Sequence, residues 1–472
     1  MDITLVPQEL ADDIIDHLHD DKQSLRSCSL VCRSWLPSSS VHLFRRMRWP
    51  PCDHALDRQR MPWNTLANCR CALTEDSPDL QDLLHFLRTT PRARDHVREL
   101  HIRFSWFDGV STPVDGADSE SDSGPAYSFD HRGLRSTDLR RTVVTTPAEL
   151  ADIVDTLGAL RCLELHDVSL SAPPSSSPDH VGRAARDLDK LCLSSLREGM
   201  DCEPLSQFLQ HFRCIRTLAL HGVQRLLGRA RRANPAIRMS GHPPSVDVLQ
   251  FCGGTFYSTY WLGAFSSMLD LRSLRVLDLL DPDTNQLRRA LPVLTQDLIR
   301  RCTSLSSLTC VYGLSSRAVM LCPAPCPTLR LLHFHGSQSP WLQIPSDLNR
   351  LERVMNSPLT SSVHQLIVNL SVTECGGYCD HPPSDDEARL RVKAKLSFPD
   401  WGLFDDFAGR LQSLTVWLSL EIGHAVTEDE DYWRSMAEEL IHGQLSLRVR
   451  EVLRLHIHVS RITLKSRPSG VY

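Results

Sequence analysis

The hexapeptide Leu-Arg-Cys-Leu-Glu-Leu at residues 160–165 decides the fold, because its spacing of apolar residues recurs along most of the chain. From Leu163 to Leu332 the central Leu returns at intervals of 28, 27, 31, 28, 31 and 24 residues. Apolar residues in this alternation predict β-strands with one buried face. Eleven such strands are predicted, at residues 97–102, 160–165, 188–193, 215–220, 246–251, 274–279, 305–310, 329–334, 363–368, 411–416 and 452–457.

Helical patterns lie between these strands, at residues 80–87, 150–157, 205–212, 294–299, 348–354 and 433–441. One strand and one helix per roughly 28 residues predict an α/β solenoid that resembles leucine-rich repeats, with about eleven repeats in residues 91–472. A doubly wound α/β sheet is the alternative. The absence of a glycine-rich phosphate loop after the first strand and the regular spacing favour the solenoid.

Composition excludes several classes of protein. The 472 residues are 41% apolar and 23% charged, with a net charge of −5, which is typical of a soluble protein and argues against one that coats nucleic acid. No stretch approaches the roughly 20 apolar residues that cross a bilayer, and no secretory signal is visible. We therefore expect a cytoplasmic or nuclear protein whose 16 cysteines are mostly reduced and buried.

Residues 1–50 have a different pattern. The first 21 residues hold seven acidic residues and no Lys or Arg. Within them, four apolar residues fall on one face of a predicted helix: Leu10, Ile14, Ile15 and Leu18. A second helical pattern contains Leu25 and Cys28, and a third short segment carries Val31 and Trp35. Three short helices make a small core, which usually requires a partner or a neighbouring domain.

Three N-terminal segments resemble the F-box motif: Leu-Val-Pro-Gln-Glu-Leu at 5–10, Ile14-Ile15, and Leu-Val-Cys-Arg-Ser-Trp at 30–35. Val6, between Leu5 and Pro7, is one residue more than the motif has at this place. The resemblance covers residues 1–50 and leaves 51–90 as a connecting or capping segment. It implies docking on the Skp-type adaptor of a cullin-RING ubiquitin ligase. The implied adaptor-binding residues are Leu5, Pro7, Leu10, Ile14, Ile15, Leu30, Val31 and Trp35.

This resemblance implies a non-catalytic, substrate-recognition subunit that contacts the adaptor, a cullin through the adaptor, and an unidentified protein target. No motif of hydrolases, nucleotide-binding loops or zinc proteases is present, so we expect neither an enzyme nor a cofactor. The alternative is a non-ligase interaction scaffold in which the helices only cap the solenoid. Cys322, Cys326, Cys375, Cys379 and His381 are too scattered to predict a four-ligand zinc site.

Several segments interrupt the repeats. Residues 109–141, rich in Ser, Asp and Gly, are predicted to be a disordered insertion, as are residues 171–179. Residues 374–387 form a third predicted insertion. A basic segment from Arg225 to Arg238 is either a nuclear address or a solvated loop.

Histidines concentrate at the two outward positions of each predicted strand. Seven occupy these 22 sites, against about one expected from 21 His in 472 residues. We expect this sheet face to bind the target, with better binding of an acidic or phosphorylated peptide as the imidazoles gain charge at low pH. A solvated surface without a role is the alternative. The candidate target-binding residues are His101, Arg103, His166, His221, His333, His335, Trp417, His456 and His458.

Overall fold

The computed structural model divides into two compact units, Met1–His211 and Phe212–Tyr472. The predicted insertion at 109–141 and the basic residues Arg225–Arg238 lie outside the residues that the structure describes. These described residues are 7–49, 79–103, 144–166, 168–171, 185–194, 202–221, 242–252, 267–280, 291–311, 319–320, 322, 324–336, 344–373, 384–397, 399–423, 426 and 429–462.

The first unit begins with three helices, α1 (Gln8–His17), α2 (Lys22–Val31) and α3 (Leu36–Arg45). The Asp21 carboxylate accepts hydrogen bonds from the backbone N–H groups of Gln23 and Ser24, and it thereby caps the first turn of α2. The three helices pack on one small core. It consists of buried Ile15, Leu25 and Cys28, against which Leu18, Trp35 and Leu43 pack.

Strand β1 (Arg46–Trp49) follows α3 directly and pairs in parallel with β2 (Glu99–Arg103). The sequence pattern missed β1. Strands β4 (Cys162–His166) and β6 (Arg186–Ser194) continue the parallel sheet of the first unit in chain order. Strands β3 (Val144–Thr145) and β5 (Ser169–Leu170) form a separate pair.

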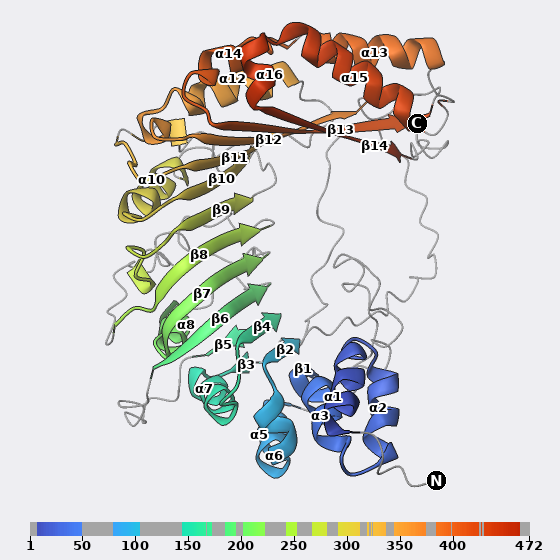
Figure 1. Cartoon of the computed structure of the whole chain (residues 1–472). Helices are drawn as coiled ribbons and strands as arrows, with labels where there is room; N and C mark the ends of the chain where they lie inside the picture. Colours follow the sequence, from blue (N-terminus) through green and yellow to red (C-terminus); the bar gives the residue numbers. More distant parts are fainter. Residues whose placement is uncertain are drawn as a thin grey trace, which may run out of the picture. The chain divides into compact units, whose positions relative to one another are not determined.

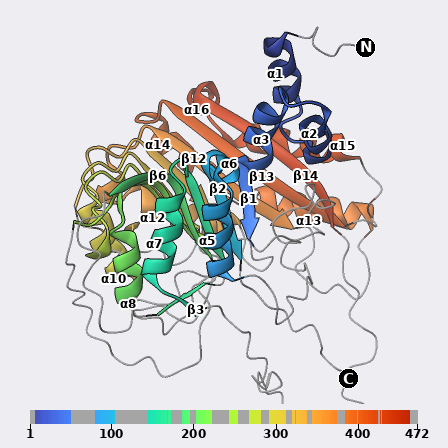
Figure 2. The same ribbon diagram turned by 90° about the horizontal axis from the view of Figure 1, so that it is seen from below.

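Among the described residues, four helices accompany these strands: α5 (Leu80–Thr89), α6 (Pro91–His96), α7 (Pro147–Thr156) and α8 (Cys202–Leu209). Local chemistry fixes where they start. Thr146 and Glu149 form a reciprocal capping box around Pro147 at the start of α7, and Asp79 and Asp82 do the same for α5. Helices α5 and α7 lie side by side in the view from below (Figure 2).

The second unit repeats this plan with eight parallel strands in chain order (Figure 1). They are β7 (Phe212–His221), β8 (Ser245–Cys252), β9 (Val276–Leu280), β10 (Ser307–Val311), β11 (Leu331–His335), β12 (Gln365–Thr373), β13 (Ser413–Gly423) and β14 (Leu453–Ile462). The described helical segments between them are α10 (Leu291–Arg301), α12 (Ile344–Met355), η5 (Pro358–Thr360), α13 (Asp385–Ser397), α14 (Leu403–Ala408), α15 (Glu430–Gln444) and α16 (Leu447–Val452).

These elements confirm an α/β fold in which parallel strands alternate with helices, as a solenoid requires. All eleven predicted strands are present as β2, β4 and β6–β14, and each predicted helical segment overlaps a helix. The segment predicted at 205–212 runs too far, because α8 ends at Leu209 and Phe212 begins β7. Helix α13 starts at Asp385, so the last residues of the insertion predicted at 374–387 are helical, while 374–383 lie outside the described residues.

The central Leu residues of neighbouring repeats stand in register and form the core. In the second unit this column is at most 1% exposed and runs through Leu218, Leu249, Leu277, Leu308, Leu332, Leu366 and Leu414. The last strand departs from the predicted register, because Leu453 rather than Leu455 pairs with Leu414. A shift of two residues keeps each side chain on its predicted face.

Burial alternates along the strands and defines two faces of the sheet. On β13, Leu414, Val416 and Leu418 are buried beneath helices, whereas Trp417 between them is 48% exposed. Helices α12–α16 cover one face of β12–β14, and within the described part of this unit no helix covers the other face (Figure 1). We call this second surface the open face. None of the helices in the described ranges combines the length and apolar character that a membrane crossing needs.

Candidate functional site

Four exposed apolar side chains lie on the first two helices. Leu10 and Ile14, one turn apart on α1, are 55% and 49% exposed, and Leu30 and Val31 at the end of α2 are 86% and 48% exposed. Side chains this apolar are costly to leave in water, and a cluster of them is typical of a protein-interaction site. We call these four residues the helical patch.

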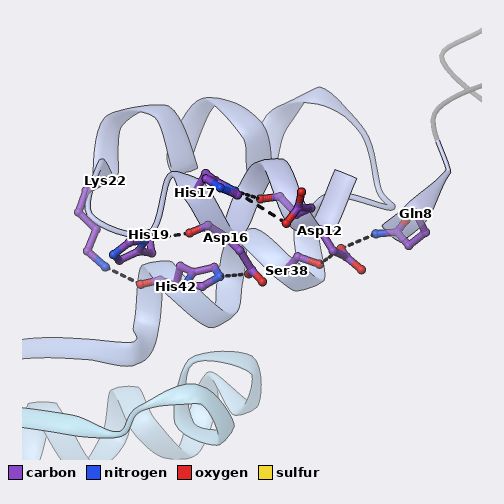
Figure 3. Close-up of polar contacts among 9 residues, drawn as sticks. Gln8, Asp12, Asp16, His17, His19, Lys22, Ser38 and His42 are labelled. Carbon is purple, nitrogen blue, oxygen red and sulfur yellow. Dashed lines mark hydrogen bonds and ion pairs between the residues drawn. The ribbon is translucent and has the colours of Figure 1, made fainter. Parts of the chain in front are cut away.

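Polar contacts hold α1 against the segment that follows α2. Gln8 Nε2 donates to the Ser34 backbone oxygen over 3.2 Å. It also donates to Asp12 Oδ1 over 2.7 Å, and the Ser38 hydroxyl donates to the same Asp12 oxygen (Figure 3). These bonds bring the start of α1 beside the chain that leaves Val31.

The remaining predicted adaptor-binding residues are divided between surface and core. Pro7 is exposed and precedes α1. Ile15 is fully buried in the helical core, and Trp35 is half-buried against it, so both support the helices that carry the patch. Leu5 lies outside the described residues.

On the sheet of the first unit, two predicted target-binding residues, His101 and His166, lie beside one buried carboxylate. Glu164 is 5% exposed, and its Oε2 lies 2.7 Å from His101 Nδ1 and 3.7 Å from His166 Nε2. Its Oε1 accepts a hydrogen bond of 2.8 Å from Lys190 Nζ. Strand register explains the cluster, because His101 pairs with Glu164 and Arg103 pairs with His166 on adjacent parallel strands.

The Glu164 carboxylate is held ionised by its neighbours. Burial alone would raise its pKa, but the nearby imidazoles of His101 and His166 and the hydrogen bond from Lys190 together lower the pKa of Glu164 well below its usual range. The cluster thus joins one anion to a lysine and two imidazoles. Removal of the carboxylate would leave these groups without their shared partner.

The open face of the second unit carries a second group of predicted residues. The rings of His333 and His335 lie 4.2 Å apart, and Asn369 contacts His335 Nδ1 at 3.1 Å. Burial lowers the pKa of His335 to about 4, with the neighbouring His333 adding to the effect, and burial also lowers the pKa of His333. The expectation that His335 gains charge as the pH falls toward 6 is therefore wrong, because it stays neutral there.

Trp417 and His456 stack on this same face. Their ring centroids are 4.1 Å apart with planes inclined by 13°, and Trp417 remains 48% exposed. The shifted register of β14 creates this pair, since it sets His456 opposite Trp417, while Asn369 pairs with Trp417 from the other side. His335, Asn369, Trp417 and His456 therefore form one row across four strands, which we call the aromatic row.

The other candidates lie apart from this row. His458 is exposed on β14 beside Ser419, and His221 ends β7. Lys190 and Asn369 were missed by sequence reasoning. Asn369 directly follows the motif at 363–368 and occupies an outward position, so the strand pattern alone could have identified it, whereas Lys190 lies before the central Leu of its strand.

The chemistry of the described residues offers little for metal binding. Among them, no group of three His, Cys, Asp or Glu side chains is placed to hold an ion. Cys322 and Cys326 are buried free thiols, and burial raises the pKa of both Cys302 and Cys310 to about 12. These cysteines serve as small apolar side chains, as predicted.

No protein-family model matches the sequence, and the search of curated proteins found no match. Three features of the fold therefore bear on function. The first unit carries the helical patch on α1 and α2 and, on its sheet, the histidine–carboxylate cluster. The second unit carries the aromatic row on its open face.

Proposed function

We propose that the protein is the substrate-recognition subunit of a ubiquitin ligase. Its helices α1–α3 act as an F-box that binds a Skp-type adaptor, and through it a cullin, while the repeats act as a leucine-rich-repeat solenoid that binds a protein target. The observation that carries the proposal is the helical patch. Its four residues occupy positions where the sequence resembles the F-box motif, and their exposure leaves them available to a partner.

Such a protein would act without making or breaking covalent bonds. Holding a target and the ligase on one chain raises the local concentration of the target near the transfer machinery. The open face suits the target-binding role, because a stacked Trp417 offers the kind of rigid aromatic anchor that dominates protein interfaces. This role places the protein in the cytoplasm or the nucleus.

A non-ligase scaffold is the second candidate, and β1 is the observation that favours it. Because α3 runs straight into β1, which pairs with β2, the three helices continue into the edge of a sheet as a cap would. If the helices served only as a cap, however, the 86% exposure of Leu30 would have no explanation. Adaptor binding separates the two candidates.

The test compares the affinity of the full chain for a purified Skp-type adaptor with that of the double variant Ile14→Ala, Leu30→Ala. Leu447→Ala is the matched control, because Leu447 is 77% exposed on α16. Complete burial of an apolar side chain is worth about 1.5–3 kcal/mol, so the double variant should bind at least about tenfold more weakly. Equal affinities for all three proteins, with unchanged circular dichroism, would reject the F-box assignment.

A further inference from the structure

A cavity of about 250 Å³ lies in the first unit, where the helices join the sheet. The turn between α1 and α2, the start of α2, the end of α3 and the first residues of β1 and β2 all line it. We call it the joint cavity. One water molecule occupies about 30 Å³ of the liquid, so the cavity has room for a ligand several times that size.

The lining of the joint cavity carries excess positive charge. Three fixed cations, Lys22, Arg45 and Arg46, face two carboxylates, Asp20 and Glu99. The excess is one positive charge (three minus two) when the lining histidines are neutral. Arg46 Nε lies 2.6 Å from Glu99 Oε2, so this pair is satisfied within the protein.

The two other cations have no carboxylate within ion-pair distance among the described residues. Lys22 Nζ donates to the backbone oxygen of His42 over 2.5 Å (Figure 3). It also donates to the backbone oxygen of Leu43 over 3.4 Å, which leaves a third donor. Burial lowers the pKa of Lys22, and the nearby Arg46 lowers it further, so an anion beside the ammonium would be favourable. Arg45 is exposed at the end of α3, and its guanidinium fork suits phosphate oxygens.

His42 supplies an unsatisfied nitrogen at the same place. Its Nε2 lies 2.6 Å from Asp16 Oδ1, which orients the ring (Figure 3). Its Nδ1 is buried and has no hydrogen-bond partner within the described part of the chain. Buried polar atoms nearly always have a partner, so this nitrogen is available to a hydrogen-bonding group bound in the joint cavity.

We propose that the joint cavity binds a small phosphate-bearing anion of about the size of diphosphate, held by Lys22 and Arg45 with His42 beside them. Such a ligand contacts residues of the helical segment together with the first residues of two strands. It would therefore stabilise the joint between α1–α3 and β1–β2. This site is separate from the helical patch and does not depend on adaptor binding.

The test titrates the full chain with pyrophosphate, with inorganic phosphate and with a phosphoserine peptide, by calorimetry in low-salt buffer that contains a metal chelator. We expect saturable, one-to-one binding of pyrophosphate that exceeds binding of inorganic phosphate. Arg45→Gln should weaken it at least about tenfold, because a charge-assisted contact to phosphate is lost. Arg33→Gln removes the same charge from an exposed residue that does not line the cavity, and it should bind as the wild type does.

The outcomes separate the sources of the phosphate group. Binding of the phosphopeptide alone, with the same dependence on Arg45, would keep the phosphate site and identify a protein as its source. Absence of saturable binding by any of the three probes would overturn the proposal, as would equal losses in Arg45→Gln and Arg33→Gln. Thermal unfolding without ligand checks that Arg45→Gln is folded, and Lys22→Gln provides a second variant with the same expected direction.

Discussion

The neutral state of His335 predicts a pH-dependent loss of stability in the second unit. An unfolded histidine takes up a proton near pH 6.5, whereas burial holds the pKa of folded His335 at about 4. The unfolded state therefore binds more protons than the folded state between these values. The free energy of unfolding falls as the pH drops through this window and is unaffected by His335 above it.

The size of the effect follows from the shift. A difference of about 2.5 pKa units lowers the free energy of unfolding by about 3 kcal/mol once His335 is protonated in both the folded and the unfolded state. About 2 kcal/mol of this loss would appear between pH 7.5 and 5. His335 is only partly buried, so solvent screening reduces the expected loss to about 1 kcal/mol.

Urea denaturation at pH 7.5, 6.5, 5.5 and 5 measures this dependence. His335→Asn removes the titrating group, so the variant should lose about 1 kcal/mol less than the wild type over that range. The difference in slope reports His335 together with its coupling to His333, because the more distant groups titrate in the same way in both proteins. His458→Asn, on exposed β14, is the control and should keep the wild-type slope. Equal slopes for the wild type and His335→Asn would refute the reasoning.

Three other predictions follow from burial and contacts. Ile15→Ala should destabilise the first unit by about 3 kcal/mol because Ile15 is fully buried, whereas Ile14→Ala, at a half-exposed site, should cost well under 1 kcal/mol in the same urea titration. Trp417→Ala should weaken binding of the target, once identified, at least about tenfold by calorimetry, while circular dichroism stays unchanged. Glu164→Gln should lower the free energy of unfolding by about 1–3 kcal/mol at pH 7. Because the pKa of Glu164 is lowered in the folded state, its carboxylate stabilises the fold only while it is charged, so in the wild type the free energy of unfolding falls below about pH 4.5. This fall should be smaller in Glu164→Gln, which has no carboxylate to protonate at this position.

The sequence predicted the repeat architecture because its signal is local. Each strand carries its own alternation, and each central Leu such as Leu277 or Leu308 is buried for the same reason. Strand β1 was missed because Arg-Met-Arg-Trp is short and its basic residues mask the alternation. The shift of β14 was also unpredictable, because spacing identifies a strand but pairing with its neighbour sets the register.

The sequence predicted which sheet face the candidate residues occupy, but not how deeply they are buried. Strand periodicity correctly placed His333 and Trp417 on the open face. It could not distinguish a neutral, half-buried imidazole such as His335 from a solvated one, because burial depends on neighbours from other strands. The joint cavity was out of reach for the same reason, since His42 and Glu99 lie far apart in the chain.

The central claim is that this chain connects an adaptor to a target, and quantitative co-isolation from cells tests it most directly. The full chain, tagged at its C-terminus, is captured, and the Skp-type adaptor and the cullin are measured per captured molecule. We predict near-stoichiometric adaptor with associated cullin for the wild type and for Leu447→Ala, and a loss of at least about tenfold for Ile14→Ala, Leu30→Ala. Absence of adaptor from the wild-type capture, or equal amounts with the double variant, would contradict the account.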